Sequence, residues 1–430
     1  MNSSTLITHI KARHIFDSRG NPTIFCKVTL ADGAEGCAAV PSGASTGKYE
    51  CIELRDKEKA YGGKGVFKAI YGINGLIREQ LVGKDAADQE AIDRLLIALD
   101  GSEQKGTLGA NALLAVSLAC ARASAAAFHQ ELYRYVGGAF ACKMPIPFMN
   151  VLNGGRHADN GLDIQEYMIV PHGATSFAGA MRMGSEVYHA LGALLKEDDY
   201  RTALGDEGGY APAMKSDEEA LRYLVRAIEF AGYRPGKDVS LALDAAASEW
   251  YSEGKYRLNH SGHTLKGNEL IDYYESLCKE FPIISLEDPL AEDDFEGFAA
   301  ITERLGKEVQ IVGDDLFVTN AHRLMRGIEE RCCNCVLIKP NQVGTLSETA
   351  KTIHLAKEHG YQIMLSHRSG ETEDSTIADL SVAFFAGQIK SGAPARAERT
   401  AKYNRLLEIE DTLEESAQFG NNPPKVVTAR

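Results

Sequence analysis

The stretch IISLEDPLAEDDFEGFAAITERLGKEVQIVGDD, residues 283–315, shows the pattern that decides the fold of most of the chain. Its first apolar run, Ile283–Leu286, ends at the carboxylate of Glu287, and its second, Val309–Gly313, ends at that of Asp314. The segment between the two runs has helical periodicity. A short apolar strand, a helix and a second apolar strand form the repeating unit of a parallel sheet. We therefore predict parallel strands that end in polar side chains.

The same unit recurs along the chain, so that polar side chains follow a series of apolar runs. The residues at these strand ends are, in chain order, Asp244, Glu287, Asp314, Lys339, His367 and Lys390. This many units in series favour a closed (β/α)₈-type barrel; a doubly wound open sheet is the alternative. In a barrel the C-terminal strand ends face one shared cavity. Helix capping would explain a single carboxylate there, but it does not call for lysine.

The N-terminal part of the chain differs, because strands come first and helices follow. Alternating apolar residues around an Asp32-Gly33 turn predict strands between Thr5 and Val40. Helical patterns cover 66–81, 89–99 and 110–128. A Gly137-Gly138 break then marks a boundary. We expect a small α+β domain at 1–140 and a barrel domain at 141–430.

Composition and charge narrow the class of protein. The 430 residues include 44% hydrophobic side chains, enough for more than one packed core. The formal net charge of −14 disfavours nucleic acid and anionic membrane surfaces as partners. We find no apolar run long enough to span a bilayer and no secretory signal, so we expect no membrane insertion and a cytoplasmic location. Cys332, Cys333 and Cys335 are predicted to be reduced thiols at the start of a buried strand.

The residues at the strand ends suggest metal-assisted chemistry on an anion. Three carboxylates around one point raise each other's pKa unless a cation neutralises them, and oxygen ligands suit Mg²⁺. Lys339 and Lys390 would lie near that metal, where a lowered pKa makes a lysine a plausible general base. Arg368 and Ser369 offer a fork and a hydroxyl group that suit a phosphate.

Two glycine-rich loops lie outside the repeating units. The sequence GDEGG, 205–209, places Glu207 in a turn, where it could serve as an acid. The sequence PSGASTGK, 41–48, is one residue short of a Walker A loop, so it is not predicted to hold a nucleotide. Its small residues and hydroxyl groups instead suit a mobile loop, 41–47, that closes over a site.

Taken together, these stretches resemble the enolase family across nearly the whole chain. The matching motifs are HIFDSRGNPT (14–23), PSGASTG (41–47), NGGRHADN (153–160), DIQEYMIVP (163–171), LGDEGGYAP (204–212), LALDAAASEW (241–250), SLEDPL (285–290), VGDDLFVTN (312–320), LIKPNQVGT (337–345), SHRSGETED (366–374) and IKSGAPARAER (389–399). The resemblance implies a small α+β domain followed by a (β/α)₈-type barrel that begins with an antiparallel hairpin.

The resemblance also implies a role for individual residues. The catalytic residues would be Glu207, Lys339, Glu166 and His157. The substrate-binding residues would be Gln165, Arg368, Ser369, Lys390 and His367. The metal ligands would be Asp244, Glu287 and Asp314 for a first Mg²⁺ and Ser45 for a second that binds with the substrate. In this assignment Lys339 removes the C2 proton and Glu207 protonates the departing 3-hydroxyl group.

The implied function is a lyase reaction of glycolysis and gluconeogenesis. It is the reversible, Mg²⁺-dependent dehydration of 2-phospho-D-glycerate to phosphoenolpyruvate, with two Mg²⁺ per active site. A homodimer or an octamer would be expected. One alternative is an acid-sugar dehydratase of the same superfamily, although Arg368 and Ser369 argue for a phosphorylated substrate. The other is a secondary binding or scaffold role in a cell-surface or secreted pool.

Overall fold

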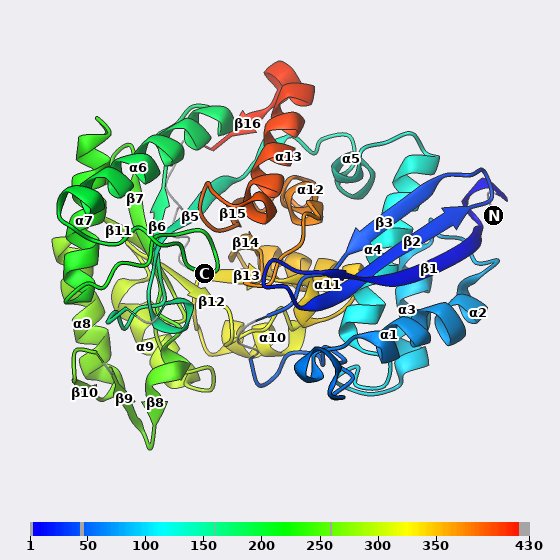
Figure 1. The fold of residues 1–430 in the computed structure, drawn as a ribbon, viewed down its shortest axis with the longest axis horizontal. Helices are drawn as coiled ribbons and strands as arrows, with labels where there is room; N and C mark the ends of the chain where they lie inside the picture. Colours follow the sequence, from blue (N-terminus) through cyan, green and yellow to red (C-terminus); the bar gives the residue numbers. More distant parts are fainter. Residues whose placement is uncertain (1–2, 44–46, 159, 259, 421–430) are drawn as a thin grey trace.

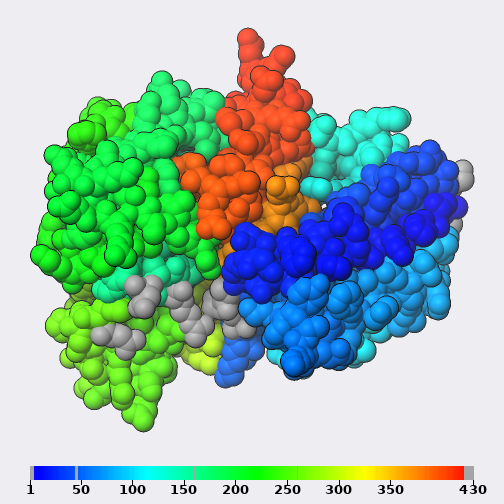
Figure 2. Space-filling model, in the orientation of Figure 1, coloured from blue at the N-terminus to red at the C-terminus, as the bar shows by residue number. Residues whose placement is uncertain are grey.

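The computed structural model describes residues 3–43, 47–158, 160–258 and 260–420, and these form an N-terminal α+β part beside a barrel (Figure 1). Figure 2 shows the N-terminal strands, in blue, against the orange segment, which comes late in the sequence of the barrel part. One contact between the two parts is a backbone hydrogen bond of 2.7 Å from Ser18 to the carbonyl of Glu371.

The N-terminal part begins with an antiparallel sheet in the order β1-β2-β3. Its strands are β1 (Ile7–Phe16), β2 (Pro22–Leu30) and β3 (Glu35–Ala39). Its helices are α1 (Phe67–Gly72), α2 (Arg78–Leu81), α3 (Gln89–Asp100), α4 (Ala110–Ala127) and α5 (Leu132–Gly137). Helix α4 packs directly on the sheet, because a Cβ at Gly36 would lie 2.1 Å from the backbone nitrogen of Ala123. The predicted order of strands followed by helices is confirmed.

Helix α4 corrects one expectation from the sequence. It is long and apolar enough to cross a membrane by length and composition, so the expectation that no such run exists is wrong. In the folded chain 83% of that segment is buried. A core helix passes the same test, because packing on all sides requires apolar residues on all sides.

The second part is a closed barrel in the order β11-β12-β13-β14-β15-β5-β6-β7. The strands are β5 (Ile146–Asn153), β6 (Glu166–Val170), β7 (Ser240–Asp244), β11 (Ile283–Glu287), β12 (Gln310–Gly313), β13 (Cys335–Ile338), β14 (Gln362–Ser366) and β15 (Gly387–Lys390). Strand β6 runs antiparallel to both β5 and β7, and the other pairings are parallel. The predicted barrel with an antiparallel start is therefore confirmed, and the open-sheet alternative is wrong.

Helices follow the barrel strands in the predicted alternation. They are α6 (Phe177–Glu197), α7 (Asp217–Phe230), α8 (Gly267–Glu280), α9 (Phe295–Leu305), α10 (Ala321–Glu329), α11 (Leu346–Glu358), α12 (Thr376–Ala383) and α13 (Ala397–Leu413). Helix α9 begins at Phe295, because the Asp294 side chain caps it by accepting the Gly297 N–H. The short strands are β4 (Lys143–Met144), β8 (Tyr251–Ser252), β9 (Lys255–Arg257), β10 (Thr264–Leu265) and β16 (Gln418–Phe419).

The inside of the barrel is filled by side chains. Buried apolar residues that include Phe148, Met168 and Leu337 form a core cluster of their own. Gln310 and Gln388 exchange two hydrogen bonds of 2.9 and 2.7 Å. Such filling leaves the C-terminal mouth as the place for a site. The buried thiols at the start of β13 are free, as predicted, and all nine cysteines of the chain lie in its described part and are free.

Candidate active site

The polar residues at the C-terminal strand ends surround one cavity of about 40 Å³. Its lining includes the predicted residues His157, Gln165, Glu166, Glu207, Asp244, Asp314, Lys339, His367, Arg368, Ser369 and Lys390. Glu287 does not line the cavity but pairs with Lys390, which does. Ser45 lies outside the described residues.

The Lys390 ammonium group lies among three buried carboxylates. Its Nζ is 2.9 Å from Asp244 Oδ2, 2.8 Å from Glu287 Oε1 and 3.1 Å from Glu166 Oε2. These contacts follow from the sheet, since Asp244 pairs in register with both Glu287 and Glu166 on its two neighbouring strands. Burial lowers the pKa of Lys390, but the surrounding carboxylates outweigh it and hold the pKa well above its usual value. The lysine is therefore charged.

A second lysine pairs with the third predicted metal ligand. Lys339 Nζ lies 2.5 Å from Asp314 Oδ2, and the Gln342 amide donates to Asp314 Oδ1 at 3.1 Å. Burial lowers the pKa of Lys339, but Asp314 and Glu287 together outweigh it, so that the pKa lies above its usual value. The protein's own groups therefore do not produce the lowered pKa expected of Lys339, because its closest partner is an anion.

The predicted ligand set fits a hard divalent cation. Glu287 is 1% exposed, and its Oε2 accepts no hydrogen bond within the described part of the chain. Burial and the neighbouring charge of Asp244 raise the pKa of Glu287 well above its usual value. A buried oxygen without a donor, among further carboxylate oxygens, suits Mg²⁺.

The distances between potential ligand atoms indicate a different acidic cluster for the cation, which shares Asp314 with the predicted ligand set. Among the described residues, Asp288, Asp314 and Asp315 bring ligand atoms within 4.8 Å of one another. Both carboxylate oxygens of Asp288, however, accept backbone N–H groups, from Asp314 at 2.9 Å and from Asp315 at 2.8 Å. Asp288 therefore orients the segment that carries Asp314 and has less capacity left for a cation. Burial raises the pKa of Asp315 to about 8.

The other end of the cavity holds two acids and two histidines. Glu207 Oε2 accepts a hydrogen bond of 3.0 Å from Asn150 and lies 3.2 Å from His367 Nε2. His157 lies between the acids, with Nδ1 3.9 Å from Glu166 and Nε2 4.0 Å from Glu207. His157, Glu166 and Glu207 also bring potential ligand atoms within 4.8 Å of one another, and so form a second group that could hold a metal ion.

The two acids differ in where their pKa values lie. Burial raises the pKa of Glu207, but His367 and His157 outweigh it and hold the pKa well below the usual value. Burial and the negative charge of Glu207 raise the pKa of Glu166 well above its usual value. The pKa values of two carboxyl groups in one buried site are thus shifted in opposite directions.

The predicted phosphate clamp already pairs with an acid. The Arg368 guanidinium makes two contacts with Glu50, of 2.8 Å at Nη1 and 3.2 Å at Nη2. Glu50 is 8% exposed and comes from the N-terminal part. The segment before it is tied to the clamp as well, because Ser42 and Gly370 exchange backbone hydrogen bonds of 2.7 and 2.9 Å. Both parts of the chain therefore build this side of the site.

Sequence reasoning missed several buried residues that orient the site. They are Glu50, Asn150, Asp288, Gln342 and Arg399. A signal existed for Asp288, which directly follows a strand-end acid in SLEDPL.

Comparison with known proteins assigns the family. Residues 7–136 match the enolase N-terminal domain, and residues 141–426 match the enolase C-terminal TIM barrel domain. The chain belongs to the enolase family. A curated enolase from Methanopyrus kandleri is 57% identical over 416 residues, which cover 96% of this chain and 97% of that relative. The chain is accordingly a lyase with the hydro-lyase activity of the enolases, as the resemblance of its motifs implied.

Proposed function

We propose that the chain converts 2-phospho-D-glycerate to phosphoenolpyruvate and water, reversibly, with Mg²⁺. The observation that carries this proposal is the meeting of Asp244, Glu287, Asp314, Lys339, Glu207 and Arg368 at one barrel mouth. An acid cluster, a base, a separate acid and a phosphate-binding fork are what a β-elimination of water from a phosphorylated hydroxy acid requires. The division into domains at 1–140 and 141–430 is part of the proposal, and the two matched family ranges support it.

We infer that Asp244, Glu287 and Asp314 hold the first Mg²⁺, and that Ser45, outside the described residues, helps to hold the second. Bound there, Mg²⁺ would supply positive charge to the substrate carboxylate as it gains negative charge. The Oε2 of Glu287, which accepts no hydrogen bond from the described residues, supports this assignment.

Lys339 is the proposed base for the C2 proton. It can accept a proton only when its ammonium has lost one, and the Asp314 contact at 2.5 Å opposes that loss. Asp314 therefore has to give up this contact before Lys339 can act. Lys390 stays charged among its carboxylates and is proposed to bind the anionic substrate together with Gln165.

Glu207 is the proposed acid for the departing hydroxyl group. Lys339 follows β13, whereas Glu207 is held against β5 by Asn150, and β14 and β15 lie between these strands in the barrel. The base and the acid can thus approach the substrate from different sides. Glu166 and His157 adjoin Glu207 and are proposed to share its proton. Arg368, Ser369 and His367 complete the proposed substrate site.

Removal of divalent metal is expected to abolish product formation. The assay follows phosphoenolpyruvate formed from 2-phosphoglycerate with Mg²⁺, then with EDTA, then with Mg²⁺ restored. Glu287→Gln should weaken Mg²⁺ binding, measured by calorimetry, by at least the roughly 10–100-fold that loss of a supporting group costs. The exposed Glu303→Gln serves as the matched control. No product, or product formation that EDTA leaves unchanged, would contradict the proposal.

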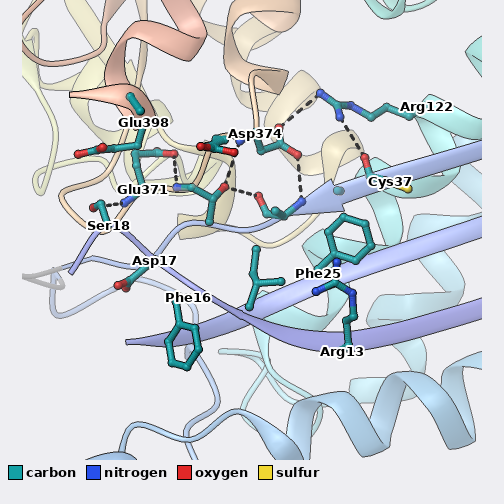
Figure 3. Close-up of a pocket in the computed structure, with 16 residues that line it drawn as sticks. Arg13, Phe16, Asp17, Ser18, Phe25, Cys37, Arg122, Glu371, Asp374 and Glu398 are labelled. Carbon is teal, nitrogen blue, oxygen red and sulfur yellow. Dashed lines mark hydrogen bonds and ion pairs between the residues drawn. The ribbon is translucent and has the colours of Figure 1, made fainter. Parts of the chain in front are cut away.

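We further propose a cytoplasmic homo-oligomer, a homodimer or an octamer. Free thiols in all nine cysteines support a reducing compartment. A cavity of about 560 Å³ between β1 and the segment after β14 supports association (Figure 3). Its lining includes both Arg13 and Glu398, opposite charges that could pair between two copies related by a two-fold axis. Phe16, which lines this cavity and is 56% exposed, contacts the rings of His14 and Tyr61.

Replacement of Phe16 by aspartate is expected to lower the mass of the protein in solution. The new carboxylate would have to be buried without a partner if two copies meet at this cavity. Light scattering measures the mass, and Phe140→Asp is the control, because Phe140 is 83% exposed and does not line the cavity. A monomeric wild-type protein, or an assembly that Phe16→Asp leaves intact, would count against this interface.

A further inference from the structure

Arg399 is a buried arginine that touches the site without lining its cavity. It lies in the first turn of α13 and is 0% exposed. One nitrogen, Nη1, lies 2.6 Å from His367 Nδ1 and donates to the carbonyl of Arg368 at 2.6 Å. The other, Nη2, donates to the carbonyls of Ser369 at 2.6 Å and Asp206 at 3.1 Å. A single guanidinium group thus holds both the phosphate-clamp loop and the loop that carries Glu207.

The contact between Arg399 and the ring of His367 fixes where the ring proton lies. A guanidinium group has only donors and is not deprotonated in proteins. The facing nitrogen, Nδ1, must therefore accept, which means that it carries no proton. A neutral imidazole has one N–H group, so that group is at Nε2. Nε2 is the nitrogen that lies 3.2 Å from Glu207 Oε2.

The placement of this proton determines which oxygen of Glu207 can carry the catalytic one. Oε2 accepts the amide N–H of Asn150 at 3.0 Å, and His367 Nε2 lies 3.2 Å away without hydrogen-bond geometry. An oxygen beside two N–H groups is a poor position for a third proton. The opposite oxygen, Oε1, faces only His157, at 4.0 Å, among the contacts described for this carboxylate.

We propose that Arg399 is a positioning residue that holds His367 as the Nε2–H tautomer, so that Glu207, when it gains the transferable proton, carries it on Oε1. This inference rests on the proposed role of Glu207 as the acid. It assigns His367 the part of a fixed donor and excludes the ring from gaining and losing a proton during turnover.

The charges around His367 agree with a neutral ring. Burial lowers the pKa of His367 to about 4, Glu207 opposes that shift, and Arg399 adds to it. Glu371 is the further acid that acts on the ring, and Lys390 and His157 line the same cavity. A group whose pKa lies near 4 is unprotonated between pH 5 and pH 8. The ring should therefore show no titration in that range.

Nitrogen NMR of the histidine-labelled full-length protein tests the proposal without reference to activity. The His367 resonances are identified as those that disappear in His367→Gln. In the wild type we expect a protonated Nε2 and an unprotonated Nδ1, unchanged from pH 5 to pH 8. A proton on Nδ1, or a ring that titrates near its ordinary pKa, would overturn the assignment.

Two variants of Arg399 separate the charge from mere packing. Arg399→Lys provides an ammonium group, which can donate hydrogen bonds but cannot accept them, so the Nε2–H tautomer should persist. Arg399→Met removes the donor and the charge, so both tautomers should appear and the ring pKa should rise. If Arg399→Met does not fold, the wild type and Arg399→Lys still decide the matter. A tautomer mixture in Arg399→Lys would contradict the role. If the tautomer is as expected but the protein forms no phosphoenolpyruvate, only the proposed function is refuted.

Discussion

Lys339→Ala is expected to lose both dehydration and the exchange of the C2 proton with solvent. A general base contributes roughly 10²–10⁴-fold to the rate, and the other lysine that the described residues place in the cavity lining, Lys390, has its Nζ held by Asp244 and Glu287. The measurements are phosphoenolpyruvate formation and the loss of deuterium from C2-labelled 2-phosphoglycerate. Exchange that persists in Lys339→Ala would show that another group removes the proton.

The same variant also leaves Asp314 without its ion-pair partner. Removal of one member of a buried pair costs about 3–5 kcal/mol, so a loss of activity could reflect a loss of folding. Lys339→Arg resolves this, because arginine restores the charge beside Asp314 but stays protonated at neutral pH and cannot act as a base. We expect Lys339→Arg to keep the thermal stability and to lack both activities. Lys351→Ala, at an exposed position, is the matched control.

The predicted strand-end residues Asp244 and Lys390 line the cavity, which shows how much of this site a sequence can reveal. Asp244 and Lys390 were found because a charged residue that ends a buried apolar run is unusual. The closure of the barrel then brings such positions to one cavity whatever their distance in sequence. Strand direction was less evident from the residues. Strand β6 is buried throughout and its composition resembles that of the parallel strands of the barrel, so its antiparallel course came only from the family resemblance.

The residues that sequence analysis missed act through contacts that span the chain. Glu50 meets Arg368 across 318 positions, and Arg399 meets His367 across 32. Such partners have no local pattern, because their positions depend on how the two parts of the chain pack. The burial of α4 has a similar origin: its apolar composition agrees equally with a core helix and with a membrane span, and only packing distinguishes the two.

Glu207→Gln should separate the two proton transfers that Lys339→Ala removes together. The amide keeps the shape of the carboxyl group and can still accept the hydrogen bond from Asn150, but it cannot give a proton to the departing hydroxyl group. We therefore expect dehydration to fall by roughly 10²–10⁴-fold while C2 exchange continues at nearly the wild-type rate. Both rates are measured on the same deuterium-labelled substrate, with the exposed Glu358→Gln as the control.

The balance of the two rates in Glu207→Gln decides between roles for the acids. Loss of exchange together with dehydration would mean that Glu207 positions the substrate or assists the base. Continued dehydration would move the acid to Glu166, whose pKa is raised by burial and by the charge of Glu207. Glu166→Gln then gives the complementary test. If Glu207 is the acid, Glu166→Gln leaves the Glu207 carboxyl group in place and is expected to impair dehydration less than Glu207→Gln does.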